Sequence, residues 1–174
     1  MLAQALRELG RTAEWRGVLR DFSVAREASL GLARYLTNFV PAVDTQRSLL
    51  SKSLGHGLDG WQSCTDARNQ FDRYHAFLRG LLLPVPELLE WAIRVSGPEG
   101  EMYWDPMVSG LLDFWKSHGG VVEVLRRERP RDSMYVDIAP ADYRLLVLCR
   151  FLARRDVRLA PLAPRFNELV SRYG

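Results

Sequence analysis

The chain has 174 residues, of which 47% are hydrophobic and 26% charged. This balance is typical of a globular protein and excludes a disordered chain. The longest stretch without Asp, Glu, Lys or Arg runs from Tyr35 to Val43, far short of the roughly 18–20 apolar residues that a membrane-spanning helix needs. Arg7 and Glu8 interrupt the apolar start of the sequence, so no signal peptide is visible. We therefore expect a soluble protein of the cytoplasm or of an organelle interior.

The formal net charge of +3 is too small to predict nucleic-acid binding unless the basic residues cluster. The two cysteines, Cys64 and Cys149, lie far apart in the sequence and form no CxxC motif. Each falls on the apolar face of a predicted helix. We interpret both as buried free thiols.

In the first half of the chain, apolar residues recur at intervals of three and four, which predicts helices. A short helix covers Met1 to Leu9. A stripe from Trp15 to Phe39 predicts one helix of about 25 residues that begins at Thr12 and ends before Pro41. Two further helices follow, over 43–58 and 63–81.

The second half continues this pattern, with predicted helices over 87–95, 106–118, 121–129 and 166–173. Asp105 and Pro106 are read as the N-cap and first residue of the second of these helices. The stretch 130–139 alternates as a strand would, but it has no convincing partner strand and is interpreted as an extended loop.

A stretch from Pro140 to Arg155 carries an apolar run broken only by Arg144 and Arg150. Pro140 suits a first helical position, and a helix that is apolar nearly all round must be covered on most sides. We expect a mostly buried central helix near 140–155. The fold prediction is therefore an all-α, single-domain helical bundle of about seven to nine helices over residues 1–174.

No catalytic or metal-binding pattern is present. The histidines, at positions 56, 75 and 118, show neither an HExxH motif nor Cys/His ligand spacing. The sequence His118-Gly119-Gly120 is similar to the oxyanion loop of some esterases, but without a GxSxG motif it is better read as a helix end. We predict a protein that is not an enzyme and has no catalytic residues, cofactor or metal.

Arginines are dense in the last third of the chain, and a shared exposed stripe could bind phosphates of nucleic acid, an anionic membrane surface or an acidic protein. The alternative is a set of solvated helix faces. The candidate anion-binding residues are Arg126, Arg127, Arg129, Arg131, Arg150, Arg154 and Arg158.

Large side chains also gather after the loop 96–100, where some of them could lie at the surface. Aromatic residues and Met are enriched in protein–protein contacts. The alternative is that Tyr103 and Trp104 fold back onto the helix that follows them. The candidate protein-interaction residues are Met102, Tyr103, Trp104 and Met107.

Four short segments resemble, in order, features of the peroxins that elongate peroxisomal membranes. The spacing between the segments differs from that family, Asn69 stands where the family has a second basic residue, and its more hydrophobic membrane-associated segments are missing. The resemblance implies an association with an anionic membrane surface. The segments are Gly10-Arg11, Arg34-Tyr35-Leu36, Ala67-Arg68-Asn69-Gln70-Phe71 and Asp113-Phe114-Trp115.

Three functional hypotheses follow. The first is a non-enzymatic helical interaction protein, an adaptor or subunit of a larger assembly, whose partner is another protein or its own copy. The second is a binder of nucleic acid or an anionic membrane surface through the C-terminal arginines. A third is a pocket for a small molecule or lipid between helices.

Overall fold

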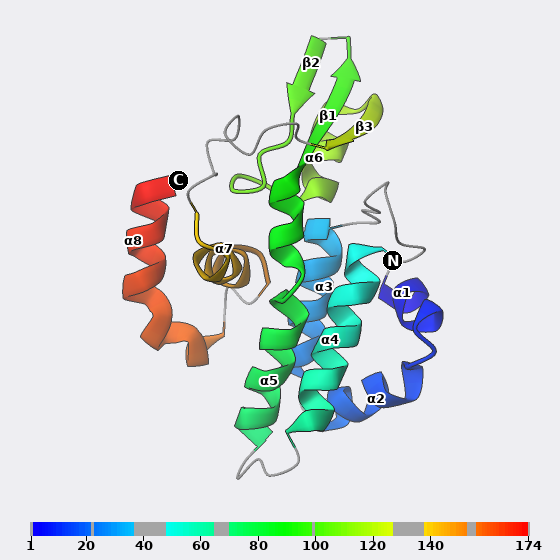
Figure 1. Cartoon of the computed structure of the whole chain (residues 1–174), viewed down its shortest axis with the longest axis vertical. Coiled ribbons are helices and arrows are strands. Elements are labelled where there is room, and N and C mark those ends of the chain that lie inside the picture. The colour runs from blue at the N-terminus through cyan, green and yellow to red at the C-terminus, as the bar shows by residue number, and fades with distance from the viewer. Residues whose placement is uncertain are drawn as a thin grey trace. The chain divides into compact units, whose positions relative to one another are not determined.

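The computed structural model describes residues 2–21, 23–36, 48–64, 70–98, 100–126, 138–152 and 156–173. The chain forms two compact units, Met1–Val85 and Pro86–Gly174 (Figure 1). The prediction of a single domain stays a prediction, because two such units can belong to one domain or to two. Within the described residues, no helix has the length and apolar character that crossing a bilayer requires.

The first unit is helical. Its core is built from fully buried leucines and aromatic rings, including Leu32, Leu54 and Phe77, and the rings of Trp15 and Phe77 stack with their centroids 6.1 Å apart. Its helices are α1 (Leu2–Glu8), α2 (Thr12–Asp21), α3 (Val24–Leu36), α4 (Leu49–Ser63) and α5 (Gln70–Leu82).

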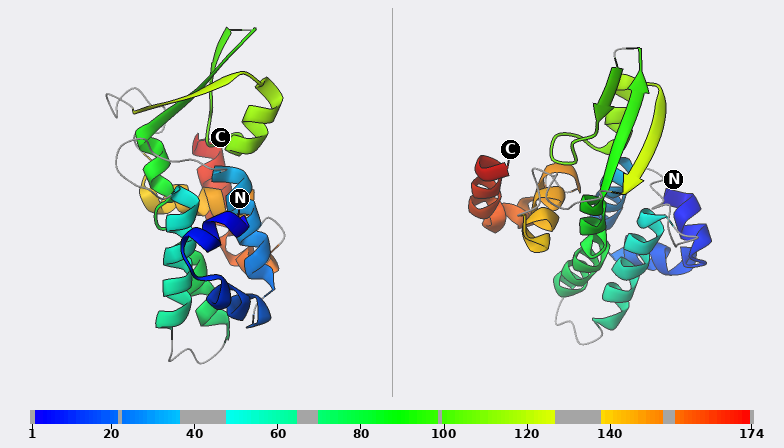
Figure 2. Two further views of the ribbon diagram at one scale, coloured as in Figure 1. Left: turned by 90° about the vertical axis from the view of Figure 1, so that its right-hand side faces the viewer. Right: turned by 45° about the horizontal axis from the view of Figure 1, so that its top comes forward.

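Helices α4 and α5 lie side by side and antiparallel (Figures 1 and 2). Glycines let their backbones touch. A Cβ atom at Gly80 would lie 2.1 Å from the carbonyl oxygen of His56, and one at Gly60 would lie 2.4 Å from that of Ala76. Both separations are below van der Waals contact, so any side chain at either position would force the helices apart.

The single helix predicted from Thr12 to Phe39 is wrong, because the chain turns between α2 and α3. A straight helix of 25 residues is about 37 Å long, whereas α4, with 15 residues, is only about 22 Å long. The turn lets both α2 and α3 pack on α4. The described residues of the Trp15 stripe are mostly buried within the chain, while Phe22 and Phe39 lie outside the described residues.

The second unit contains a three-stranded antiparallel sheet with strand order β2-β1-β3. A 3₁₀ helix, Val85–Glu90, leads into β1. The strands are β1 (Trp91–Gly97), β2 (Gly100–Tyr103) and β3 (Val121–Arg126), and α6 (Leu111–His118) lies between β2 and β3 in sequence. Figure 2 shows the strands side by side with α6 against one of their faces.

The all-α prediction is therefore wrong. The helices predicted over 87–95 and 121–129 are largely strands, because residues 91–97 alternate buried and half-buried side chains with a period of two and residues 121–126 are rich in β-branched valine. The predicted start at Pro106 is wrong as well. The Asp105 carboxylate caps a turn by accepting from the Met107 N–H at 2.7 Å, and α6 begins at Leu111.

A helix is present over the described part of the predicted stretch 140–155, while its central place in the fold stays a prediction. Helix α7 (Pro140–Val147) has proline in its first turn and continues as a π-helical segment, Leu148–Leu152. Tyr143, Leu146 and Val147 are fully or almost fully buried. A 3₁₀ helix, Val157–Leu162, then leads into α8 (Ala163–Tyr173).

Helix α8 is held to α7 largely by charge. Arg165 donates to both carboxylate oxygens of Asp142, at 2.9 and 3.0 Å, and also pairs with Glu168. These hydrogen bonds, that to Asp142 first, raise the pKa of Arg165. Leu169 is the one buried residue described in α8.

Candidate functional site

The two faces of the sheet have different surroundings. On β1, Trp91, Ile93 and Val95 are buried, and Val95 shares a hollow with His118 of α6. This inner face is the one that α6 covers. Strand pairing then fixes the opposite side, which we call the outer face: Ala92, Arg94 and Ser96 of β1, Glu101 and Tyr103 of β2, and Val121, Glu123 and Leu125 of β3.

Exposed apolar side chains concentrate on the sheet and its connections. Of the eleven large hydrophobic residues that are exposed among those described, seven lie between Met102 and Leu125. Three of the seven are on the outer face, with Val121 67% exposed, Tyr103 58% and Leu125 40%. Exposed apolar groups that cluster in this way indicate an interaction surface, whereas scattered ones do not.

An ion cluster occupies the centre of the outer face. The Arg94 guanidinium donates to Glu101 from β2 at 2.8 Å and to Glu123 from β3, so it joins all three strands. The hydrogen bond to Glu123 contributes most to raising the pKa of Arg94, although desolvation opposes it. Two carboxylates against one guanidinium leave the centre of this face with a formal charge of −1.

The excess of acid extends over the whole segment that builds the sheet. Residues 86–126 carry a formal charge of −4, although the complete chain carries +3. The remaining residues therefore carry +7. The charged residues of this segment are the acids Glu87, Glu90, Glu99, Glu101, Asp105, Asp113 and Glu123 and the bases Arg94, Lys116 and Arg126.

The predicted protein-interaction residues divide between the surface and the interior. Tyr103 and Met102 are 58% and 38% exposed and point to opposite faces of β2. Trp104 and Met107 are buried, and the Trp104 indole N–H donates to the carbonyl oxygen of Ser109 at 2.9 Å. Trp104 therefore folds back, whereas Tyr103 remains at the surface.

The predicted anion-binding residues are only partly described. Arg126 is exposed at the end of β3, 3.9 Å from Glu90, and the Arg150 guanidinium lies 6.0 Å from the centre of the Phe151 ring. Neither contact indicates a shared phosphate site. The remaining candidates lie outside the described residues or, for Arg158, have no described side chain: Arg127, Arg129, Arg131, Arg154 and Arg158.

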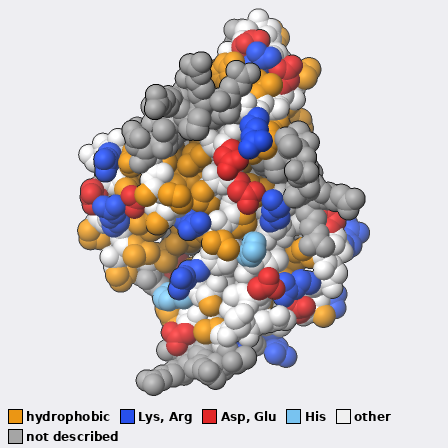
Figure 3. Space-filling view, viewed as in Figure 1, with side chains coloured by type: hydrophobic (Ala, Val, Ile, Leu, Met, Phe, Trp, Pro, Cys, Tyr) orange, Lys and Arg blue, Asp and Glu red, His pale blue; other side chains and the backbone are white. Residues whose placement is uncertain are grey.

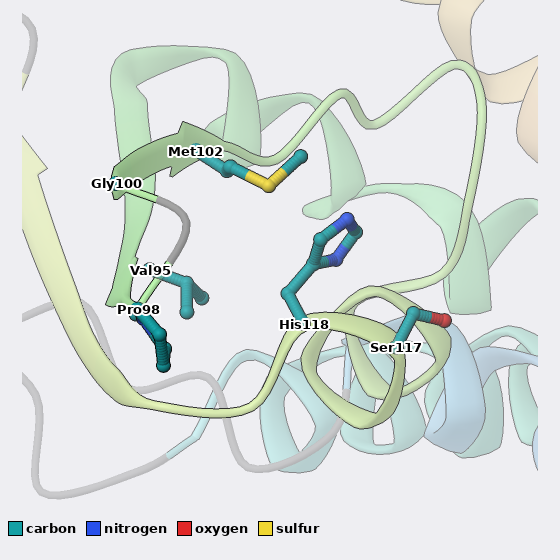
Figure 4. A pocket seen from close by; sticks show the side chains of 7 residues that line it. Val95, Pro98, Gly100, Met102, Ser117 and His118 are labelled. Atoms are coloured by element: carbon teal, nitrogen blue, oxygen red, sulfur yellow. The ribbon is translucent and has the colours of Figure 1, made fainter.

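A hollow of about 240 Å³ opens between the tip of the β1–β2 hairpin and the end of α6. In Figure 4 the His118 ring points from the end of α6 toward Met102. Its Nδ1 lies 2.8 Å from the carbonyl oxygen of Phe114. Because a carbonyl can only accept, Nδ1 is the donor in this contact, and in the neutral imidazole Nε2 is then an acceptor. The lining residues are Val95, Gly97, Pro98, Gly100, Met102, Ser117 and His118.

The described residues that line this hollow form neither an acid–base pair nor an activated nucleophile. Among the described residues that line it, His118 is the one titratable side chain, and the Ser117 hydroxyl donates to the carbonyl oxygen of Asp113 at 2.9 Å. Gly119, with φ of 60°, caps α6 through its N–H to the Trp115 carbonyl, so the His118-Gly119-Gly120 sequence is the helix end that the sequence predicts.

Among the described residues, no three His, Cys, Asp or Glu side chains lie together as a metal ion would require. Cys64 and Cys149 are free thiols and each is half-buried rather than fully buried. Burial raises the pKa of the Cys149 thiol.

Neither family models, curated proteins nor solved structures show a match to this chain. The likeness to peroxins stays a resemblance between short segments, and these segments fall in both units. Arg11 ties the start of α2 to Gly55, Asp59 and Gln62 of α4, a contact that stabilises the first unit.

Sequence reasoning missed the outer face because it assigned its strands to helices. Two signals could have revealed it. Trp91, Ile93 and Val95 alternate with smaller or polar residues, and Val121, Val122 and Val124 form a β-branched run that helices disfavour.

Proposed function

We propose that this protein is a non-enzymatic interaction protein, an adaptor or subunit of a larger assembly, and that it contacts its partner through the outer face of the sheet. The observation that carries the proposal is the concentration of exposed apolar side chains on this segment. In Figure 3, hydrophobic, acidic and basic side chains lie together over the strands at the top of the view. This mixture of apolar contact area and charge is typical of non-obligate protein interfaces.

The partner is another protein or a second copy of the chain. Nucleic acid or an anionic membrane surface remains the alternative, through the C-terminal arginines, but the acidic charge of the sheet segment opposes either of them at the outer face. The compartment that we propose is the cytoplasm or an organelle interior, which agrees with two free thiols.

Site-specific photo-crosslinking in cells tests the proposal. A benzophenone amino acid at Val121, 67% exposed on the outer face, should give a discrete protein adduct. The same group at Leu30, 38% exposed on α3, is the matched control and should give none. Equal labelling at both positions, or none at Val121, would contradict the proposed contact surface. An adduct with nucleic acid at Val121 would favour the alternative partner.

A further inference from the structure

Within the described residues, no strand pairs with the β3 edge of the sheet. Natural edge strands avoid pairing through Lys, Pro, bulges or short length. Strand β3 has six residues, Val-Val-Glu-Val-Leu-Arg, with no proline or lysine, and it pairs with β1 residue by residue without a bulge. Its one acid, Glu123, is already engaged by Arg94. A regular, valine-rich edge of this kind is suited to accept another strand.

The pairing geometry shows which backbone groups face this edge. The Trp104 N–H donates to the Ile93 carbonyl at 2.8 Å, so the odd-numbered residues of β1 direct their N–H and C=O groups toward β2. The even-numbered ones, paired with Val121, Glu123 and Leu125, then direct theirs toward β3. It follows that Val122, Val124 and Arg126 direct their N–H and C=O groups to the side of β3 away from β1, where no described strand pairs with them.

Charge selects the kind of strand that fits. The segment that builds the sheet carries −4, and two acids surround Arg94 on the outer face. A second copy pairing through its own β3 would bring two segments of −4 together, and like charges across an edge oppose pairing. A strand with basic side chains gains from the same field, provided that its cations lie toward Glu123 and away from Arg126 at the end of β3.

We propose that β3 binds a basic, valine-rich or similarly β-branched extended segment of a partner protein by strand addition along its open edge. The inference rests on the proposed function. It extends the contact surface from the outer face to the β3 edge, and it specifies the partner as a basic extended segment. Main-chain hydrogen bonds at Val122 and Val124 supply affinity, and the acidic sheet supplies the preference for basic partners.

The test uses the full chain and capped synthetic peptides as long as β3, with valine alternating with lysine, glutamate or serine. We expect the lysine peptide to bind most tightly and to lose affinity as salt rises. On binding, the amides of Val122 and Val124 should become protected from hydrogen exchange. Equal binding of the glutamate peptide would overturn the charge preference, and unprotected amides would overturn strand addition.

A pair of variants at one position separates the backbone from the side chain. Val122 is 40% exposed and its N–H faces the open edge, so Val122→Pro removes one donor where proline is tolerated. Val122→Thr keeps the N–H and the β-branching. We expect Val122→Pro to weaken lysine-peptide binding about tenfold and Val122→Thr to change it by less than about twofold. Equal loss in both variants would overturn strand addition.

The peptide also provides a control that does not depend on folding of the proline variant. Methylation of alternate amide nitrogens, on the edge that would face β3, should abolish binding to the unchanged chain, whereas methylation on the other edge should not. Homodimerisation through β3 without peptide would overturn the inference. If Val121 crosslinks to a partner that lacks a basic extended segment, the proposed function stands and this inference falls.

Discussion

The α4–α5 pair of the first unit buries its apolar side chains, whereas the sheet of the second unit leaves several of them exposed. In α4, eight residues are buried, and glycines bring its backbone against that of α5. In β3 no residue is buried, and two of its valines and its leucine are at least 40% exposed. The described residues of the first unit bury most of their large apolar side chains, whereas the sheet leaves a larger share of its own exposed to solvent.

This difference suggests separate roles: the helix pair stabilises its unit, and the exposed strand is available to bind a partner. A closed helix pair gains most of its free energy from burial, so its sequence is constrained by volume. An exposed apolar strand adds little to the stability of its own unit and is costly in solution, which is why we propose a role in binding for it. The predictions below test whether the two regions differ in this way.

Truncation of a leucine should give the largest contrast. Leu54 of α4 is 0% exposed, and Leu54→Ala leaves a cavity that should lower the free energy of unfolding by ~2–5 kcal/mol. Leu125 of β3 is 40% exposed, and Leu125→Ala should cost ~0.5 kcal/mol or less. Urea unfolding followed by circular dichroism measures both. Similar losses would show that the sheet is as closed as the helix pair.

Glycine substitutions test the close approach of α4 and α5. Gly80→Ala places a methyl group against the His56 carbonyl and should lower the free energy of unfolding by ~1–3 kcal/mol. Gly17 lies within α2, and a Cβ added there would meet nothing within 4 Å, so Gly17→Ala should raise stability by ~0.5–1 kcal/mol. The same unfolding measurement applies, and a common sign for the two changes would refute the contact.

The sequence predicts the helical part of the fold well because three-and-four periodicity is a local signal. Helices α1, α7 and α8 appear close to their expected positions, and Pro140 lies in the first turn of α7. Helix α5 ends where expected, but it begins at Gln70 because Ser63 belongs to α4. The turn between α2 and α3 is not predictable in this way. The three-and-four spacing of apolar residues continues through it from Val18 to Ala25 without a break.

The sheet escapes prediction for a related reason. Strand β1 pairs with β3 across an intervening strand and helix, and a short apolar run cannot be assigned to helix or strand without knowing its partner. The candidate site inherited this error. Trp104, one of its predicted residues, is buried. The helix predicted over 121–129 hides the exposure of Val121 and Leu125, although the valine run at its start favours a strand.

The attachment of α8 should depend on salt, unlike the packing of α4 on α5. The Asp142–Arg165 pair is partly exposed to solvent, and salt screens such ion pairs. Asp142→Asn should reduce the melting temperature slightly at low salt and have no effect at high salt. A double-mutant cycle with Arg165→Gln isolates the coupling. Loss that persists at high salt would show a packing role for Asp142.

The smallest effect concerns Cys149, which tests whether the π-helical end of α7 is shielded from water. Burial raises the pKa of the Cys149 thiol above its ordinary value of 9.0, so folding favours the protonated thiol. The resulting stability is fully present below pH 9 and is lost as the pH rises through the folded-state pKa, because the unfolded chain releases the proton more readily.

Cys149→Ala should therefore remove a small part of the alkaline fall in stability, seen as a flatter dependence of the urea midpoint on pH between about pH 8 and pH 10. Alkylation of Cys149 should also be slower at about pH 8 than that of an unstructured cysteine peptide, because less thiolate is present. A half-buried Cys149 has a raised pKa only if water is largely excluded from its sulfur atom. Alkylation at the rate of the peptide would mean that the Cys149 thiol is open to water.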